Sequence, residues 1–281
     1  MLTVNIGPIA LALDHLLLLL ALGLATLVGW RVARRGGDNP ESSLFNLFIL
    51  GLVCARIGFV IAYWPLYRDD LVQIVDIRDG GFLPWIGLLT VVLGALWAGW
   101  RRPARRKPLG WGLASGALFW ILASWASHLY EQGTQLPHLT LKNAQGQEVP
   151  LDSHRGKPLV INIWATWCPP CRREMPVLQQ AQHDYPEITF LFVNQGETPQ
   201  IVTNFLATTG LNLSHVLFDA GGRLATGVGS MALPPTLFFV GDGRLVGSPL
   251  GALSRASLHH ALQSVDEDLR RAPTPAPRNA P

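Results

Sequence analysis

The sequence predicts a chain in two parts: an α-helical membrane domain with four transmembrane helices, then an α/β domain with a mixed sheet and helices on both faces. The chain has 281 residues, enough for two domains. Long apolar blocks fill the first part, whereas the second part alternates short β-branched runs with helical patterns. We therefore assign a membrane domain to residues 1–130, a linker to 131–136, an α/β domain to 137–270 and a disordered, Pro/Ala-rich tail to 271–281.

Four apolar stretches of the first part are candidates for crossing a membrane. Each is close to the length of roughly 20 residues that a helix needs to span a bilayer. They are Ile9–Trp30, Leu44–Trp64, Phe82–Trp100 and Leu109–Tyr130. Basic residues follow the first stretch and none precedes it, which is the reverse of a secretory signal peptide. We therefore expect this helix to be retained and the lipid bilayer to be a partner of the chain.

The charges of the loops predict the orientation. Arginines gather after the first stretch and again at residues 101–107, whereas the second loop is mainly acidic. The positive-inside rule places the two basic loops in the cytoplasm, and four crossings then place the second domain outside. In a Gram-negative cell this is a multi-pass inner-membrane protein whose soluble domain faces the periplasm. Basic residues placed beside spans do not indicate nucleic-acid binding, so no nucleic-acid partner is expected.

Three ionisable residues, Asp14, His15 and Arg56, lie inside the predicted spans. Ionisable groups are costly in lipid and are functional candidates for that reason. Asp14 and His15 are near the outer end of the first span, where they can also reach the membrane interface.

The stretch at residues 164–171 carries the candidate chemistry, and its sequence is WATWCPPC. It follows an apolar run that predicts a buried strand and precedes a helical pattern. Cys168 therefore falls at the start of a helix, where free N–H groups and the helix dipole favour a thiolate. Such settings lower a thiol pKa into the range of roughly 3.5–7.5. Cys171 lies one turn further on, shielded and close enough to form a disulfide with Cys168.

Two other interpretations of the cysteine pair are open. A zinc site would need a second close Cys or His pair, but the third cysteine, Cys54, lies in a predicted span. A purely structural disulfide is disfavoured because a two-residue gap at a helix start is a strained, reducible geometry. We favour redox catalysis, with no metal and no cofactor beyond the redox-active disulfide Cys168–Cys171.

The motif and its flanks, residues 162–167 and 172–176, resemble the TlpA/ResA-like branch of the thioredoxin superfamily. Members of this branch are membrane-tethered periplasmic thiol–disulfide oxidoreductases, and the similarity covers roughly residues 134–268. The resemblance implies a thioredoxin fold, a catalytic pair Cys168 and Cys171, and substrate contact at Trp167. It also implies periplasmic disulfide-containing proteins as substrates and a membrane electron donor of the DsbD/CcdA type. Apocytochrome c, another periplasmic oxidoreductase and a copper-site protein are all possible substrates.

The stretch at residues 233–236, Leu-Pro-Pro-Thr, is the second candidate site. Thioredoxin-fold proteins place a cis-proline beside the active-site sulfurs, just before a hairpin. A cis X–Pro bond exposes the preceding backbone, so that a substrate strand can pair with it. The pattern of the branch favours Pro234 and assigns substrate pairing to Leu233, whereas the shorter turn of thioredoxin would match Pro235. Two prolines in an ordinary turn are the remaining alternative.

One position departs from thioredoxin. Thioredoxin has a buried Asp six residues before its first cysteine, and this chain has Asn162, as the branch usually does. Because Asn cannot titrate, a proton from Cys171 must pass to another group, such as water or Glu174. Glu174 has a strong alternative interpretation as an exposed helical residue, because an acid–base role needs a proximity that the sequence does not show.

The membrane part resembles the N-terminal part of prolipoprotein diacylglyceryl transferases at residues 45–48, 55–58 and 79–82. That family follows its Gly-Gly turn with a catalytic His, and Trp85 stands at the matching position. We therefore expect a membrane anchor or docking surface rather than lipid transfer.

Taken together, these patterns predict a membrane-anchored periplasmic oxidoreductase that reduces protein disulfides. The alternative is a copper-site or cytochrome assembly factor on the same fold. Such copper-binding factors use Cys-x-x-x-Cys and a distant His, and the two-residue gap here argues against them.

Overall fold

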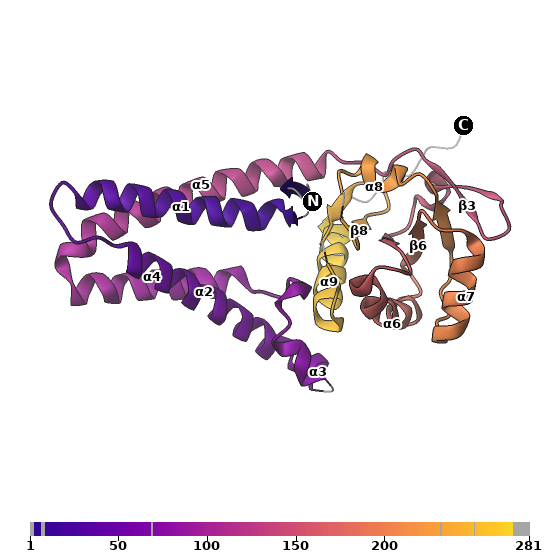
Figure 1. Cartoon of the computed structure of the whole chain (residues 1–281), viewed down its shortest axis with the longest axis horizontal. Coiled ribbons are helices and arrows are strands. Elements are labelled where there is room, and N and C mark those ends of the chain that lie inside the picture. Colours follow the sequence, from indigo (N-terminus) through magenta and orange to yellow (C-terminus); the bar gives the residue numbers. More distant parts are fainter. Residues whose placement is uncertain (1–2, 7–8, 69, 231, 250, 272–281) are drawn as a thin grey trace. The chain divides into compact units, whose positions relative to one another are not determined.

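The computed structural model describes residues 3–6, 9–68, 70–230, 232–249 and 251–271 (Figure 1). The described chain divides into two compact units, Thr3–Tyr130 and the residues from Glu131 onward. Apart from Arg271, the tail predicted at 271–281 lies outside the described residues.

The first unit is helical apart from one short hairpin at its start. Its strands are β1 (Thr3–Ile6) and β2 (Ile9–Ala12), and its long helices are α1 (Leu13–Ala33), α2 (Glu41–Ala62), α4 (Pro84–Arg101) and α5 (Arg106–Gln132). Short elements connect them: α3 (Trp64–Tyr67), η1 (Leu71–Ile74), η2 (Ile77–Asp79) and η3 (Pro103–Arg105). The first helix was predicted from Ile9, but β2 pairs with β1, so the helix begins at Leu13.

Three segments of the described chain are long and apolar enough to cross a membrane, namely Leu13–Ala33, Glu41–Ala62 and Pro103–Leu129. The predicted count of four is therefore corrected to three. The fourth predicted span, α4, has 18 residues but is not among these three. Pro84 and Arg101 occupy its two ends, and the helix packs beside α2 in the same unit.

Small residues let the helices of this unit approach closely. Helices α1 and α5 lie side by side, as do α2 and α4 (Figure 1). A Cβ atom added to Gly112 would lie 2.7 Å from the carbonyl oxygen of Ala25, and one on Gly87 would lie 3.0 Å from that of Gly51. Backbone contact at small residues is typical of helix pairs in membranes. The lipid tails are as apolar as the side chains, so helices associate there through close packing and not through the hydrophobic effect.

The two basic segments meet at one end of this unit. The Nη1 group of Arg105 donates to the Ser43 hydroxyl at 3.1 Å, and its Nε lies 3.6 Å from a carboxylate oxygen of Asp38. A Cβ atom on Gly37 would lie 2.9 Å from the carbonyl oxygen of Ala104. The segment after α1 and the segment after α4 are therefore neighbours, because α4 runs back alongside α2.

The second unit is an α/β domain. Its strands are β3 (Thr140–Asn143), β4 (Glu148–Pro150), β5 (Leu159–Trp164), β6 (Thr189–Gln195), β7 (Val216–Asp219), β8 (Thr236–Phe239) and β9 (Leu245–Gly247). Its helices are η4 (Leu151–His154), α6 (Pro169–Asp184), α7 (Pro199–Thr209), α8 (Arg223–Gly227) and α9 (Arg255–Arg271). In the segment predicted as a linker, Leu136 is buried and its N–H donates to the carbonyl of Gly243 at 2.7 Å.

The seven strands form one sheet in the order β4-β3-β7-β6-β5-β8-β9. Strands β5, β6 and β7 are parallel, and the other pairs are antiparallel. Helices α6, α7 and α9 pack on one face, and α8 and η4 pack on the other. The predicted mixed sheet with helices on both faces is confirmed.

Strand β5 explains how the sequence positions the site. All six of its residues are buried, and successive side chains point to opposite faces. Val160 and Trp164 join the core under α6, α7 and α9, and Ile161 and Ile163 join the core on the other face. The alternation therefore turns Asn162 toward α6, the helix that carries the cysteines.

Candidate active site

The cysteine pair lies where β5 gives way to α6. Cys168 caps the helix, and the Cys171 N–H points at its sulfur at 3.3 Å. Pro169 and Pro170 fill the first helical positions and have no N–H, so the Cys171 N–H is the first free donor of the helix. The two sulfurs form a disulfide with a Cα–Cα distance of 5.3 Å. Both cysteines are buried, and Cys168 at 3% exposure is the less shielded of the two, since Cys171 is fully buried.

Glu197 fixes the loop that precedes Cys168. Its carboxylate accepts hydrogen bonds from the Thr166 N–H at 2.7 Å and from the Thr166 hydroxyl, and the Asn194 amide donates to it at 2.8 Å. The sequence analysis missed Glu197. The signal that could have found it is the parallel pairing of Trp164 with Asn194, because the loops that leave two such strands meet at one sheet edge.

The proline loop lies beside the same edge. The Leu233–Pro234 bond is cis, which is the alternative that the sequence favours. The Ile163 N–H donates to the Pro235 carbonyl at 3.1 Å, so this loop is bonded to the end of β5 that leads to the cysteines. Trp167, the predicted substrate contact next to Cys168, is 68% exposed. The substrate contacts of Trp167, Leu233 and Pro234 stay predictions.

Glu174 is the residue whose environment the sequence could not predict. It lies one turn beyond Cys171 on α6, and its side chain is fully buried, so its interpretation as an exposed helical residue is wrong. The Asn162 amide donates to Oε1 at 2.7 Å, and the Leu253 N–H donates to Oε2 at 3.1 Å. Burial raises the pKa of Glu174 to about 8, against the two hydrogen bonds, which lower it. This pKa is close to the value of about 8.5 for a free thiol.

The surroundings of Glu174 also suit a protonated carboxyl. In the assigned orientation of the amide, the Asn162 Oδ1 atom is buried and has no hydrogen-bond partner among the described residues. A half-turn of the amide would direct that oxygen to Glu174, where a protonated carboxyl could donate to it. The Asn162 amide can therefore form a hydrogen bond with the ionised and with the protonated carboxyl of Glu174.

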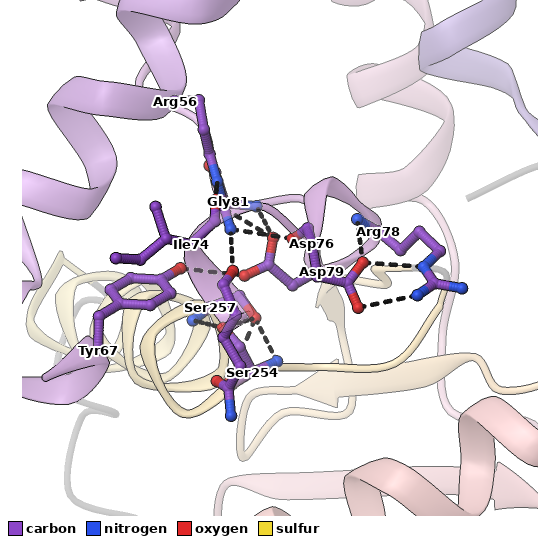
Figure 2. A network of polar contacts seen from close by, with 10 residues as sticks. Arg56, Tyr67, Ile74, Asp76, Arg78, Asp79, Gly81, Ser254 and Ser257 are labelled. Carbon is purple, nitrogen blue, oxygen red and sulfur yellow. Dashed lines mark hydrogen bonds and ion pairs between the residues drawn. The ribbon is translucent and has the colours of Figure 1, made fainter. Parts of the chain in front are cut away.

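A pair of serines positions Leu253, whose N–H donates to Glu174. The Ser257 N–H donates to the Ser254 hydroxyl at 3.1 Å, and the Ser254 N–H donates to the Ser257 hydroxyl at 2.9 Å (Figure 2). This reciprocal cap fixes the start of α9. The residue just before Ser254, Leu253, is thereby held with its N–H on Glu174.

Arg56, the candidate inside a predicted span, lies in a buried network at the end of α2 (Figure 2). Its guanidinium pairs with Asp79 at 2.8 Å, and the Tyr67 hydroxyl donates to the other oxygen of that carboxylate at 3.0 Å. Backbone carbonyl groups accept the remaining bonds, and these belong to Gln73, Ile74, Asp76 and Gly81. Every N–H of the guanidinium thus has an acceptor, so we assign Arg56 a structural role that fixes the segment between α3 and α4.

The other residues of the membrane part that the sequence analysis singled out are exposed or partly exposed. Asp14 and His15 are exposed in the first turn of α1, and Cys54 is partly exposed within α2. Trp85 is 62% exposed in the first turn of α4.

Three features define the class of the soluble unit. They are a disulfide at the start of a helix, a cis-proline loop that is hydrogen-bonded to the strand before that helix, and a sheet with this strand order. The soluble unit is a thioredoxin-fold thiol–disulfide oxidoreductase. The AhpC/TSA family model, which describes thioredoxin-like domains, matches residues 132–247.

Curated relatives narrow this class. The thiol–disulfide oxidoreductase ResA of Geobacillus thermodenitrificans is 30% identical over 135 residues, which cover 47% of this chain and 77% of the relative. ResA of Bacillus subtilis is 28% identical over 130 residues, covering 46% of this chain and 72% of the relative. The chain belongs to the ResA family of thiol–disulfide oxidoreductases.

A solved structure is also similar to the soluble unit. It is a secreted Mycobacterium tuberculosis disulfide oxidoreductase described as homologous to E. coli DsbE. The two share 26% identity with a TM-score of 0.40, over 46% of this chain and 96% of that one.

The membrane part has a match of its own. The family model of prolipoprotein diacylglyceryl transferase matches residues 2–126, in agreement with the resemblance noted at the Arg56 and Asp79 motifs. The chain therefore joins a membrane region that is similar to this transferase to an oxidoreductase domain that follows it.

Proposed function

We propose that this protein is a membrane-anchored reductase of protein disulfides that works outside the cytoplasm, through the dithiol of Cys168 and Cys171. One observation carries the proposal: the first free N–H of α6 points at the Cys168 sulfur. A helix start stabilises negative charge, so the reduced Cys168 is held as the thiolate, which is the nucleophilic form.

The reaction then proceeds in two exchanges. The Cys168 thiolate forms a bond to one sulfur of the substrate disulfide, and the other substrate sulfur leaves and takes up a proton. Cys171 next loses its proton and attacks the Cys168 sulfur, which releases the second substrate thiol. Two electrons and two protons pass to the substrate, and the protein is left with the Cys168–Cys171 disulfide.

Glu174 is suited to the second exchange. It lies on the same helix as Cys171 at a spacing of three residues, which puts the two side chains on one face. Its pKa of about 8 lets it accept a proton from a thiol and release it again near neutral pH. We assign it the role that a buried Asp has in thioredoxin, which Asn162 cannot perform.

The membrane part supplies the anchor and, we propose, the contact with the electron donor. The disulfide must be reduced again by a dithiol, and a membrane donor of the DsbD/CcdA type fits this requirement. We propose that α4, which packs along α2, also returns through the bilayer, so that the chain crosses it four times. The contact between the two basic segments supports this orientation, because both segments then face the cytoplasm and the soluble domain lies outside.

Cysteine variants of the full chain in nanodiscs test the mechanism. Cys168→Ser is expected to abolish reduction of insulin, and Cys171→Ser is expected to accumulate a mixed disulfide with its substrate. The control is Cys54→Ala, which is expected to retain full activity because Cys54 lies in α2. Full turnover by Cys168→Ser would contradict the mechanism.

The reduction potential decides the direction of electron flow. A value near that of thioredoxin, about −270 mV, supports a reductase, whereas a value near about −120 mV would make the protein an oxidant. Stoichiometric, tight copper binding by the reduced protein without disulfide exchange would instead support the assembly factor.

A further inference from the structure

A groove runs between α6 and α7 next to the cysteine pair. Its volume is about 450 Å³. The residues that line it include Pro169, Arg172, Arg173 and Pro176 on α6, with Phe205 and Leu211 on the other side. The spacing of the α6 residues is that of one helix face, and Cys171 and Glu174 lie buried on a different face of the same helix.

The groove is positively charged. Arg172 and Arg173 are both exposed, and among the described residues no carboxylate lines the groove. Within the described part of the chain, neither arginine takes part in an ion pair. Two other exposed arginines of this unit differ in this respect, because Arg155 and Arg223 each lie within 4 Å of a carboxylate.

A stack of side chains orients one of the two guanidinium groups. The ring of Phe205 packs on the ring of the buried Trp164 with 5.8 Å between their centres, and the guanidinium carbon of Arg172 lies 5.5 Å from the centre of the Phe205 ring. A guanidinium that rests on an aromatic ring through its flat face keeps the N–H groups along its edge free. Those edge groups bind a carboxylate with two parallel hydrogen bonds.

The groove begins one residue beyond Cys168. Pro169 follows Cys168 directly, and the Arg172 N–H donates to the Cys168 carbonyl at 3.1 Å. From Pro169 to Pro176 the helix advances about 10 Å, which is the length of about three residues of an extended chain. A substrate whose cysteine reaches Cys168 can therefore place its next few residues in the groove.

We propose that this groove binds an acidic segment of the protein substrate, with an Asp or Glu within about three residues of the cysteine that Cys168 attacks. The carboxylate pairs with Arg172 and Arg173, and an apolar neighbour contacts Phe205 and Leu211. The inference rests on the proposed reductase function and adds to it the chemical class of the substrate.

Single-turnover reduction of three matched peptides tests the proposal. The full chain in nanodiscs is reduced with dithiothreitol, freed of excess reagent and mixed with a peptide that holds an internal disulfide. The peptides differ only in one residue three positions after the first cysteine, which is Asp, Asn or Lys. The dithiol supplies the two electrons, so no further reductant is needed, and quenched samples are analysed by mass spectrometry.

The expected order of rates is Asp above Asn above Lys, with about a threefold to tenfold preference for Asp over Asn at low salt. The preference is expected to fall close to one in Arg172→Gln/Arg173→Gln and in 0.5 M salt, whereas Arg172→Lys/Arg173→Lys retains part of it. Lys157→Gln is the matched control, because it removes an exposed positive charge near the opposite end of β5.

Comparing rates as ratios separates the two proposals. If the unmodified protein reduces the Asp and Asn peptides equally fast, the groove does not select an acidic segment and the inference is overturned. An unchanged preference in Arg172→Gln/Arg173→Gln overturns it as well. If none of the peptides is reduced, the reductase function itself fails, whatever the groove binds.

Discussion

At pH 7 the buried carboxyl of Glu174 is mainly protonated, because burial raises its pKa to about 8. In the proposed mechanism it must be ionised to take the proton of Cys171. The rate of the resolving step is therefore expected to rise with pH and to level off above about pH 8.

Glu174→Gln tests this assignment. The variant keeps the shape of the side chain but removes its proton acceptor, so the decay of the mixed disulfide is expected to slow by about 100-fold, a low value for general acid–base catalysis. The inflection near pH 8 should disappear from the rate profile measured by rapid quenching between pH 6 and pH 10. A variant with an unchanged profile would show that another group takes the proton.

The same residue predicts how stability depends on pH. The pKa of Glu174 is about 8 when folded, against 4.5 for an ordinary Glu, so between these values only the folded state holds the proton. The free energy of unfolding is therefore expected to fall as pH rises through this window, by at most about 1.4 kcal/mol per pH unit, and to level off above it.

Scanning calorimetry of the oxidised full chain in detergent at pH 5, 7 and 9 measures this effect. Glu174→Gln cannot titrate, so the melting temperature of its soluble unit should change less across this range. It should also exceed that of the unmodified protein at pH 9. An equal loss of stability in both proteins would mean that other groups cause the pH dependence.

The residue-level predictions from the sequence succeeded where the determinants are local. The position of Cys168 at the tip of a helix follows from its own neighbours, and the preference for Pro234 follows from a four-residue pattern. The burial of Glu174 depends on Leu253, 79 residues away, and the brace formed by Glu197 depends on the register of two strands. No local pattern contains that information.

Among the elements, the segment between α3 and α4 depends on one buried ion pair. Arg56→Gln would leave the Asp79 carboxylate buried without its partner, and breaking a buried pair in this way costs about 3–5 kcal/mol. We therefore expect a markedly lower melting temperature of the membrane part in detergent. Reduction of a small disulfide by the soluble unit is expected to remain.

Arg78→Gln is the matched control in the same segment. Arg78 also pairs with an aspartate, Asp76, but its side chain is 68% exposed, so removing this pair should have little effect. The double variant Arg56→Gln/Asp79→Asn should recover part of the loss, because no charge is left buried alone. Equal effects of Arg56→Gln and Arg78→Gln would contradict the structural role.

The elements themselves were predictable where hydropathy alone decides them. Helices α2 and α5 lie close to the apolar stretches that predict them. The sequence placed the start of α1 too early, because Ile9–Ala12 are apolar enough for a helix but pair with β1. It also counted α4 as a fourth span, but this helix is not among the three segments of the described chain that are long and apolar enough to cross a membrane.

At the scale of the whole molecule, the basic segments predict the orientation. In a Cys54→Ala background, a cysteine at Val75 should react with a membrane-impermeant maleimide added outside spheroplasts, since Val75 is 80% exposed in the segment between α2 and α4. A cysteine at Ala104, which is exposed beside the basic residues, should react only after lysis. The reverse pattern would place the soluble domain in the cytoplasm.

The architecture of the soluble unit was predictable from the order of its strands and helices. A buried run followed by Cys-x-x-Cys and a helix determines how the centre of the sheet is built. The order in which the outer strands join, with β3 between β4 and β7, depends on pairings between distant segments that no periodicity reveals.

The hydrogen bond from Leu253 to Glu174 has a consequence for synthesis of the chain. The cysteines leave the ribosome well before residue 253 does, and until the last helix docks, the acid beside them is hydrated and titrates like a free glutamate. A half-made chain therefore carries the thiols without a proton acceptor matched to them. We therefore expect the resolving step to reach its full rate only after residue 253 and the helix that follows it have docked.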